Sequence, residues 1–340
     1  KSDLESSVLD VERYDGKLYI GTNAGAYCFD VSQQKFVQVE GIGIQCFDLM
    51  TFDGQLLAVS YLGLSEIKGL KGYPIRKSVN RDFVPFVMQR SKANPRRLFI
   101  GLGEKSASLY KKEDGTWVDE GFVKGIDGFS FNAGVEMRDG TFWFGTVQSG
   151  IVKMEFDDPS AGPENQVATI KVYSTEEGIP EGPATVWEID DMPYFFTADK
   201  ILTYDADSDS FIQTDMFDPV IGLMTRRNAA MIQDQADRLW VFSDKIAIGE
   251  KTDNNTYTFN DKPFLPLSDY SFNWIYPEST GITWIAAAEG LIRYDENIEK
   301  NYAEEFSSLV RLVKTGKGMM ISSGKTDFRK PPKIDYSDNS

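Results

Sequence analysis

The chain has 340 residues, a formal net charge of −16 and no histidine. We do not expect so acidic a protein to bind nucleic acid or anionic lipid surfaces, because the phosphates of both repel it. A chain without histidine cannot use Ser-His-Asp or Cys-His catalysis, nor bind zinc, copper or iron through imidazole. Its two cysteines, Cys28 and Cys46, are too few for a four-cysteine zinc site. We therefore expect no bound metal and no cofactor.

Residues 15–30 form a pattern of two short apolar runs separated by turns. Asp15-Gly16 indicates a tight turn, since both residue types tolerate positive φ. Leu18–Gly21 is long enough for one buried strand, and Gly25–Asp30 supplies a second. A single hairpin of this kind cannot bury its own faces, so it must pack against further strands.

The same hairpin pattern occurs seven times. The position of Gly21 is repeated at residues 59, 101, 145, 196, 242 and 286. A period of about 40–50 residues with several strands per copy is typical of β-propeller blades. A helical solenoid would need 3.6-residue periodicity, which the copies lack. A β-sandwich has no reason to repeat one aromatic–glycine hairpin along the chain.

Each copy is expected to add an inner strand before the hairpin and an outer strand after it. The expected inner strands are Val8–Tyr14, Gln45–Phe52, Phe83–Gln89, Ser130–Met137, Thr185–Ile189, Ala229–Gln233 and Phe272–Tyr276. The expected outer strands include Lys35–Val39, Thr116–Asp119, Ile170–Tyr173, Ser210–Gln213 and Thr256–Asn260. The sequence therefore predicts an all-β fold: a seven-bladed β-propeller of four-stranded blades over residues 1–300.

Three segments depart from the regular blade pattern. The hairpin at Gly103–Ser108 is loose and should project from one face, and Asp157–Gln166 reads as a surface loop. Residues 301–340 do not repeat the blade and are interpreted as a linker and the truncated start of a further β module. Strands are expected there at Leu309–Val313 and Met319–Ile321.

The cysteines and repeated aromatic residues are expected in the core. Cys28 falls in a third strand and Cys46 in an inner strand, where each acts as a small buried hydrophobe, although a disulfide between neighbouring blades stays open. The aromatic residues that should pack blade against blade are Tyr19, Phe99, Trp143, Tyr194, Trp240 and Trp284.

The copies resemble a known family. The segments LYIGTNAGAYCFD, TFWFGTVQSGIVKMEF and ITWIAAAEGLIRYD are similar to the two-component-regulator propeller repeat. The connection YSTEEGIPEG is similar to that family's interblade turn. The tail FSSLVRLV…IDYSDNS resembles the segment that joins such propellers to a triple-tyrosine β-sandwich. Blades 2, 5 and 6 depart from the repeat, with Val59, Phe196 and Phe242 in place of its glycine.

This resemblance implies the extracytoplasmic sensor part of a membrane histidine kinase or hybrid two-component sensor. Such a domain works on the periplasmic or extracellular face of a bacterial membrane, tethered through segments outside this chain. Because many members respond to carbohydrate, the resemblance also implies an oligosaccharide or another small polar ligand. It leaves homodimerisation open.

Three functions remain to be weighed. A non-catalytic ligand-sensing domain is favoured, with a structural protein–protein interaction propeller as the alternative. A polysaccharide-acting propeller enzyme is less favoured, because no pair of carboxylates stands out at a repeated turn beside arginine or tyrosine. We therefore predict that this domain is not an enzyme.

A ligand is expected on one face of the ring. In a propeller, the turns between second and third strands share a face with the connections that enter each inner strand, and functional loops cluster there. Aromatic and arginine side chains carry most recognition energy. The predicted ligand contacts are Tyr61, Arg81, Arg226, Arg227 and Tyr270. The alternative is that loops are polar in any case and that the arginines pair with nearby acids.

Overall fold

The structure is a computed structural model. It describes residues 6–79, 81–103, 105–126, 129–147, 150–217, 220, 229–254, 256–298, 313–314 and 320–322. The chain divides into two compact units, residues 1–298 and 299–340. The first unit contains all the hairpin repeats. In the second unit, β28 (Val313–Lys314) pairs antiparallel with β29 (Met320–Ser322), which overlaps the strand expected at Met319–Ile321. The strand expected at Leu309–Val313 lies outside the described residues except for Val313.

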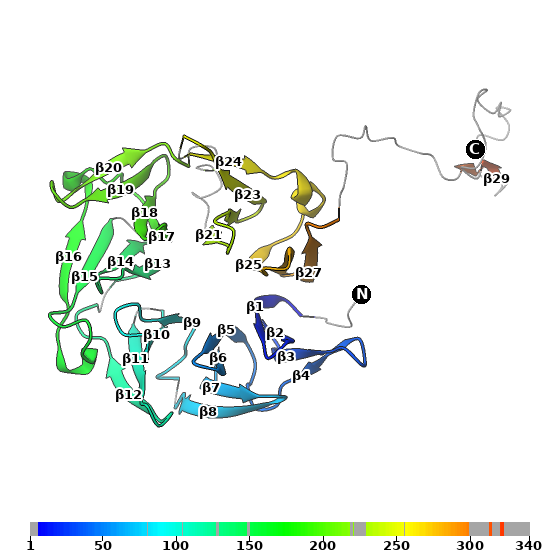
Figure 1. Cartoon of the computed structure of the whole chain (residues 1–340), viewed down its shortest axis with the longest axis horizontal. Helices are drawn as coiled ribbons and strands as arrows, with labels where there is room; N and C mark the ends of the chain where they lie inside the picture. Colours follow the sequence, from blue (N-terminus) through cyan, green and yellow to red (C-terminus); the bar gives the residue numbers. More distant parts are fainter. Residues whose placement is uncertain are drawn as a thin grey trace. The chain divides into compact units, whose positions relative to one another are not determined.

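Seven antiparallel sheets surround a central axis in the first unit, as Figure 1 shows. Within each sheet the strands are hydrogen-bonded in chain order, and the first strand lies nearest the axis. Six sheets have four strands, and the seventh has three among the residues that the structure describes. The prediction of an all-β, seven-bladed propeller is confirmed.

The strands of blades 1 to 3 follow one another without a crossover. Blade 1 contains β1 (Val8–Tyr14), β2 (Lys17–Thr22), β3 (Gly25–Asp30) and β4 (Lys35–Gln38). Blade 2 contains β5 (Cys46–Phe52), β6 (Gln55–Ser60), β7 (Gly63–Lys68) and β8 (Lys71–Lys77). Blade 3 contains β9 (Val87–Arg90), β10 (Arg97–Gly101), β11 (Ser106–Lys111) and β12 (Trp117–Phe122).

Blades 4 to 7 repeat the arrangement. Blade 4 contains β13 (Phe131–Glu136), β14 (Phe142–Thr146), β15 (Ile151–Glu155) and β16 (Thr169–Tyr173). Blade 5 contains β17 (Thr185–Ile189), β18 (Met192–Phe196), β19 (Ile201–Asp205) and β20 (Ser210–Thr214). Blade 6 contains β21 (Ala230–Gln233), β22 (Leu239–Phe242), β23 (Ile246–Lys251) and β24 (Tyr257–Asn260). Blade 7 contains β25 (Phe272–Pro277), β26 (Ile282–Ala287) and β27 (Gly290–Asp295). Short 3₁₀ helices occur at η1 (Pro163–Asn165), η2 (Thr175–Glu177) and η4 (Lys262–Leu267).

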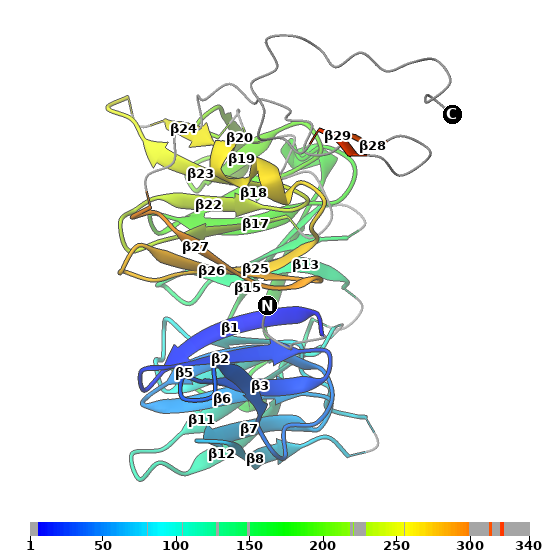
Figure 2. The same cartoon turned by 90° about the vertical axis from the view of Figure 1, so that its right-hand side faces the viewer.

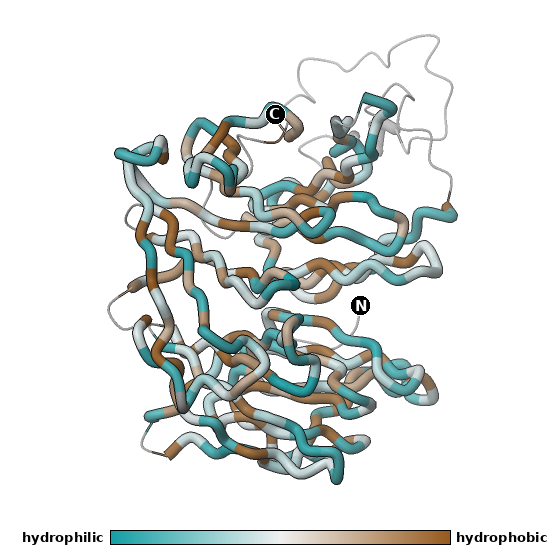
Figure 3. The backbone as a smooth tube through the Cα atoms, turned by 60° about the vertical axis from the view of Figure 1, so that its left-hand side comes forward, coloured by the Kyte–Doolittle hydropathy of each residue, from teal (hydrophilic) through white to brown (hydrophobic). Residues whose placement is uncertain are grey.

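The tight turns form where the sequence favours them. Asp15 and Gly16, between β1 and β2, have φ values of 48° and 70°. Both values lie in the left-handed region that Asp and Gly tolerate best. Figure 3 shows hydrophilic residues at many of these turns and hydrophobic stretches along the strands, as expected for blades that pack face to face.

The repeated glycine marks a close approach between neighbouring blades. A Cβ on Gly21 would lie 2.7 Å from the backbone oxygen of Cys46, and a Cβ on Gly145 would lie 2.4 Å from that of Ala184. In both cases the obstacle is the backbone of the next blade, which cannot move aside as a side chain could. Phe196 and Phe242 occupy the same position in blades 5 and 6 and are buried, so there the next blade lies far enough away to admit a ring.

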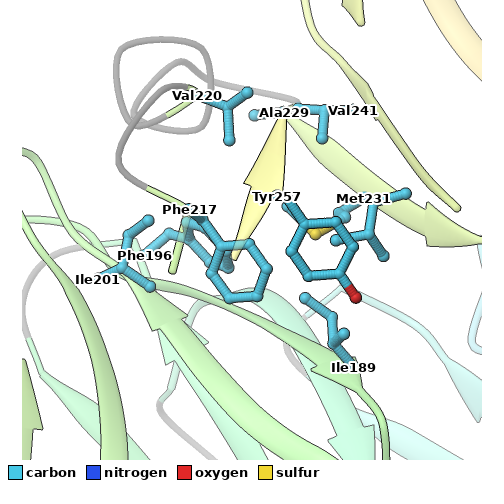
Figure 4. Close-up of a cluster of buried hydrophobic side chains, with 10 residues drawn as sticks. Ile189, Phe196, Ile201, Phe217, Val220, Ala229, Met231, Val241 and Tyr257 are labelled. Atoms are coloured by element: carbon cyan, nitrogen blue, oxygen red, sulfur yellow. The ribbon is translucent and has the colours of Figure 1, made fainter. Parts of the chain in front are cut away.

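Aromatic rings fill the space between blades 4, 5 and 6. The Trp143 ring contacts the rings of Phe195 and Phe211 in blade 5, with centroid distances of 5.3 and 6.1 Å. Figure 4 shows the interface between blades 5 and 6, where Phe196 of blade 5 and Tyr257 of blade 6 pack around Phe217. The expectation that the repeated aromatic residues pack blades together holds for these joints.

Two of the repeated tryptophans also make a polar contact. The indole Nε1 of Trp240 donates to Asp234 Oδ2 at 3.0 Å, and that of Trp284 donates to Glu278 Oε1 at 2.7 Å. In each case the carboxylate lies six residues before the tryptophan, across the turn between the first two strands of the blade. A buried indole N–H needs such a partner, and neither phenylalanine nor tyrosine would supply the same donor.

Blade 7 meets blade 1 at a seam made of side chains. Figure 2 shows β1 beside blade 7, and β1 contacts both β25 and β26. The Asn273 amide donates to the Val8 carbonyl at 2.6 Å, and Arg13 pairs with Glu278 at 2.7 Å. Val8 and Val11 pack in one apolar cluster with Trp274. We call this junction the seam.

Three expectations need correction or completion. Inner strand β9 begins at Val87 and not at Phe83, because Phe83 is buried beneath the Arg76 guanidinium, 4.0 Å from its ring, instead of pairing in the sheet. The loose hairpin of blade 3 is shorter than predicted, since β11 already begins at Ser106. Cys28 and Cys46 are buried free thiols, as expected for small hydrophobes.

Candidate functional site

A cavity of about 600 Å³ lies in the central channel of the ring. Its walls come from β1, β5, β9 and β25 and from β21 with the turn that follows it. The charged residues among its lining are four acids, Asp10, Glu12, Asp48 and Asp234. No lysine or arginine belongs to the lining, all of which lies in described residues. The side chains of the cavity lining that can carry a charge near neutral pH are therefore all carboxyl groups.

β-Bulges orient two of these acids. The pairing of β1 with β2 shifts by one residue between Val8 and Asp10, and that of β5 with β6 shifts between Cys46 and Asp48. A bulge inserts one extra residue and re-aims the side chains that follow it. Asp10 and Asp48 therefore occupy the same place in successive blades and reach toward the next inner strand.

Both carboxylates bind backbone groups of the neighbouring blade. The Leu49 N–H of β5 donates to Asp10 Oδ2 at 2.7 Å, and the Met88 N–H of β9 donates to Asp48 Oδ2 at 2.6 Å. Two residues further along each strand, the Thr51 N–H of β5 donates to Glu12 Oε1 of β1 at 3.2 Å. The open edge of an inner strand leaves such N–H groups without a sheet partner, and an unpaired buried N–H is costly. The acids thus join blades 1, 2 and 3.

Burial raises the pKa of the carboxyl groups of Asp10, Asp48 and Glu12. It raises the pKa of Asp10 well above its usual value, and the neighbouring Asp48 charge adds to the effect. Burial raises the pKa of Asp48 to about 7, although hydrogen bonds from Met88 and Asp10 oppose the rise. Burial also raises the pKa of Glu12. Near neutral pH, the Asp10–Asp48 pair therefore retains a proton.

The acids of the cavity differ in how they are neutralised. Burial opposes ionisation of Asp234, but hydrogen bonds from the Trp240 indole and from Arg238 hold its pKa below the usual value. The Arg238 Nε–H lies 2.8 Å from Asp234 Oδ2. Among the ion pairs of the described residues, none involves Asp10, Glu12 or Asp48. These three acids face the cavity without a cationic partner.

Aromatic rings border the cavity on blades 2 and 3. Phe47 and Phe86 both line it, and their ring centroids are 4.9 Å apart. The Tyr61 ring also contacts the Phe47 ring, with a centroid distance of 5.5 Å. A ligand in the cavity would thus meet carboxylates within the channel and aromatic rings at this edge.

The predicted ligand face exists as a structural feature. The turns between second and third strands are hydrogen-bonded to the connections that enter the inner strands. Examples are Asn23 N–H to Ser7 O at 3.2 Å, Ser78 N–H to Leu62 O at 3.0 Å and Ala288 N–H to Ser271 O at 2.8 Å. The two sets of loops therefore lie on one face, as the repeat pattern suggested.

The predicted contact residues do not all come together. Tyr61 lies one ring away from the cavity, and Arg81 lies in the exposed connection between β8 and β9, three residues after Ser78. Tyr270 is half-buried in the apolar cluster between blades 6 and 7. Arg226 and Arg227 lie outside the described residues. A role for these five residues in ligand binding stays a prediction.

Sequence reasoning missed Asp10 and Asp48. Both residues fall within the expected inner strands Val8–Tyr14 and Gln45–Phe52, to which no binding role was assigned. A signal was present, however, because in both strands an acid follows two residues after the first buried residue, in Val8-Leu9-Asp10 and Cys46-Phe47-Asp48. The repetition of an acid at one register position in adjacent blades was the observation to use.

Metal sites and membrane-spanning helices are two further features to consider in the described residues. No group of three or more His, Cys, Asp or Glu residues is placed there to hold a metal ion. Within the same part of the chain, none of the helices has the length and apolar character needed to cross a bilayer.

Comparison with known proteins identifies relatives by fold. No protein-family model matches the chain, and no curated protein sequence matches it significantly. Among solved structures, the chain is similar to the extracellular domain of a protein described as a hybrid two-component system from B. thetaiotaomicron, with a TM-score of 0.59 and 16% identity. That match covers 86% of this chain but only 40% of the other.

Two further solved structures of similar fold have different roles. Virginiamycin B lyase from Staphylococcus aureus matches with a TM-score of 0.56 and 14% identity, over 86% of this chain and 95% of the lyase. YCF48 bound to D1 peptide matches with a TM-score of 0.55 and 12% identity, over 87% of this chain and 93% of YCF48. Identities this low establish the propeller fold and leave the function to the site itself.

Proposed function

We propose that this chain is a non-catalytic, extracytoplasmic ligand-binding propeller of a signal-transduction protein. The central cavity carries the proposal, because it is a concave site of about 600 Å³ with convergent polar groups on a rigid ring. The ligand is a small polar molecule or an oligosaccharide, whose hydroxyl groups would donate to the carboxylates of Glu12 and Asp48. The fold likeness to an extracellular two-component sensor domain supports the cellular setting.

A cavity-filling variant tests this proposal. Met50 lines the cavity and is half-buried, so Met50→Trp should obstruct it, whereas Met192→Trp alters an exposed residue on β18 outside the lining. The full chain is screened by thermal shift against a panel of oligosaccharides and polar metabolites. We expect at least one compound to raise Tm in the wild type and in Met192→Trp but not in Met50→Trp. A panel without any hit, or a hit that Met50→Trp retains, would contradict binding in the cavity.

Signalling is tested in the longer protein that contains this chain. If the cavity senses the ligand, Met50→Trp should abolish the response to the compound found in the screen, while Met192→Trp leaves it intact. The predicted contacts are tested in the same assay with Arg226→Ala combined with Arg227→Ala. A normal response of that double variant would remove the two arginines from the site without removing the cavity.

A protein–protein interaction propeller is the second candidate. One observation favours it: large apolar side chains are exposed together beside the cavity, on the connections of blades 2 and 3. YCF48, a propeller of similar fold, was solved bound to a peptide. The two candidates are compatible, because a partner can bind the rim of a ring whose channel holds a small ligand.

A further inference from the structure

An apolar patch borders the cavity on the face formed by the entering connections. It consists of Ile44, Tyr61, Leu62, Val79, Phe86 and Val87, all of which are exposed. Leu62 is 53% exposed and Ile44 is 67% exposed, which is high for such side chains in a rigid region. We call this group the rim patch. Contiguous apolar surface on a soluble protein commonly marks an interaction site.

Contacts link several members of the rim patch, although they come from separate segments. A Cβ on Gly43 would lie 2.6 Å from Leu62 Cγ, so the Leu62 side chain lies directly over the connection that also carries Ile44. Phe47 links Tyr61 on one side, at 5.5 Å, to Phe86 on the other, at 4.9 Å. Val87 follows Phe86 and packs beside Gly101 of the same blade.

The rim patch is held in place by hydrogen bonds. Ser60 Oγ donates to the Ile42 carbonyl at 2.5 Å and accepts from the Leu62 N–H at 3.2 Å. The Leu62 carbonyl accepts from the Ser78 N–H, which fixes the next connection, and the Phe86 N–H donates to the Gly101 carbonyl at 2.9 Å. The apolar side chains are therefore presented by an ordered framework. A preorganised surface of this kind loses little entropy when a partner binds.

We propose that the rim patch binds an extended polypeptide segment of a partner protein, one that carries apolar side chains next to a lysine or arginine. This inference rests on the second candidate function and specifies its partner, since the segment covers the rim whereas the small ligand lies within the channel. Four of the six patch residues are aliphatic and offer no hydrogen bonds, so they suit the apolar side chains of a polypeptide better than a sugar. A net charge of −16 disfavours an anionic lipid surface.

Charge complementarity specifies the basic residue. Phe86 and Val87 belong both to the cavity wall and to the rim patch. Phe47 also lines the cavity and contacts the patch through the Phe86 ring. A long cationic side chain entering at this edge would pass the two phenylalanine rings, which attract cations through their faces. It would then reach Asp48 and Glu12, which have no cationic partner among the described residues. The segment would thus supply the positive charge that the cavity lacks.

A random peptide library tests the proposal with a defined probe. Twelve-residue peptides displayed on phage are selected against the full chain, and the best sequence is synthesised for titration by fluorescence polarisation. We expect selected peptides to combine apolar residues with at least one lysine or arginine. Leu62→Asp should weaken binding at least tenfold. Leu265→Asp is the matched control, because Leu265 is 57% exposed but belongs to η4 before blade 7, and it should bind normally.

The role of the basic residue needs a second comparison. Replacing that lysine or arginine in the peptide by norleucine should weaken binding about fivefold to the wild type and to Leu265→Asp. The loss should be clearly smaller for Glu12→Gln, which keeps an oxygen to accept from the Thr51 N–H but lacks the charge, while Asp48 stays in place. An equal loss in the wild type and in Glu12→Gln would overturn the charge argument.

Other outcomes overturn the proposal as a whole. These are a selection that yields no binder above background, selected peptides without basic residues, and binding that Leu62→Asp leaves intact. A wild-type dimer that Leu62→Asp converts to monomer, detected by light scattering after gel filtration, would assign the rim patch to a second copy of the chain. Thermal melts of both aspartate variants must coincide, so that lost binding is not mistaken for lost folding. None of these results depends on the small-molecule screen of the cavity.

Discussion

The joints among blades 1, 2 and 3 and those among blades 4, 5 and 6 solve the same packing problem with different chemistry. In the first region, Asp10 and Asp48 extend from one inner strand and accept N–H groups from the next. In the second region, rings such as Trp143, Phe195 and Phe217 fill the space between the sheets. We call these the carboxylate joints and the aromatic joints.

The difference shows how a repeat protein can line a cavity with polar groups although every blade keeps the same fold. The carboxylate joints keep polar groups beside the channel, and the cavity is lined by β1, β5 and β9 of this region. The aromatic joints bury their contacts between the sheets, and neither β13 nor β17 contributes to the cavity lining. Both regions bury apolar clusters between their blades, and the carboxylate joints add polar groups beside the cavity.

Removing a ring from an aromatic joint should have the largest effect. Trp143 is buried and contacts four aromatic rings, so Trp143→Ala should lower the free energy of unfolding by about 3–5 kcal/mol. Denaturant titration followed by circular dichroism measures the change. Trp143→Phe, which keeps a ring, is the control and should lose clearly less. Equal losses in both variants would show that the ring contacts do not stabilise this joint.

Adding a methyl group where two backbones meet should have the next largest effect. Gly145→Ala places a Cβ 2.4 Å from the Ala184 oxygen and 2.6 Å from the Thr185 Cα, so we expect destabilisation by about 1–3 kcal/mol. Gly101→Ala is the matched control at the same position of blade 3. The one atom closer than 3 Å to its Cβ would be a methyl carbon of Val87, at 2.7 Å, which belongs to a side chain that can rotate away. Similar melting temperatures for the two variants would refute the close-approach account of the repeated glycine.

The carboxylate joints should respond to pH, whereas the aromatic joints should not. The pKa values of Asp10 and Asp48 are raised in the folded protein, and that of Asp48 is about 7. Folded molecules therefore bind more protons than unfolded ones between about pH 4 and pH 7. The contribution of these groups is fully present below about pH 4 and is lost as the pH rises through 7, by at most about 1.4 kcal/mol per pH unit for each proton.

The pH dependence is measured as the free energy of unfolding between pH 5 and pH 8. Asp48→Asn, whose amide oxygen can still accept from the Met88 N–H, should flatten this slope. Asp209→Asn is the control, because hydrogen bonds from Lys171 and two tyrosines hold the pKa of Asp209 far below this window. A slope that Asp48→Asn leaves unchanged would show that the carboxylate joint does not titrate as proposed.

The seam should be the least sensitive of the junctions to loss of its polar contacts. Glu278 accepts from both Arg13 and the Trp284 indole, but Arg13 is about one-third exposed. Glu278→Gln retains an acceptor and loses only the charge, so we expect a loss of about 0.5–1 kcal/mol. Denaturation in 0.05 M and 1 M NaCl distinguishes the causes, because high salt should reduce the gap between variant and wild type. A larger gap at high salt would contradict an ion-pair role.

The sequence was sufficient for the architecture because the fold depends on local features that repeat. Asp-Gly turns, apolar runs and a periodic glycine each fix one blade, and the ring follows from their number. The cavity could not be predicted in the same way. Asp10 and Asp48 lie within expected strands, and the bulges that re-aim their side chains toward the next blade appear only in the structure. The rim patch also depends on contacts between distant segments, which the order of residues does not reveal.

The seam also bears on how the ring would respond to mechanical force. Among the described residues, blades 7 and 1 share no strand, so backbone hydrogen bonds of a common sheet do not cross the junction. Tension applied between Val8 and Asp295 would fall on side-chain contacts: the Asn273 amide, the Arg13–Glu278 pair and the packing of Trp274. The side-chain contacts of the seam would break before the hydrogen bonds within any blade, so the ring would open while its sheets stayed intact.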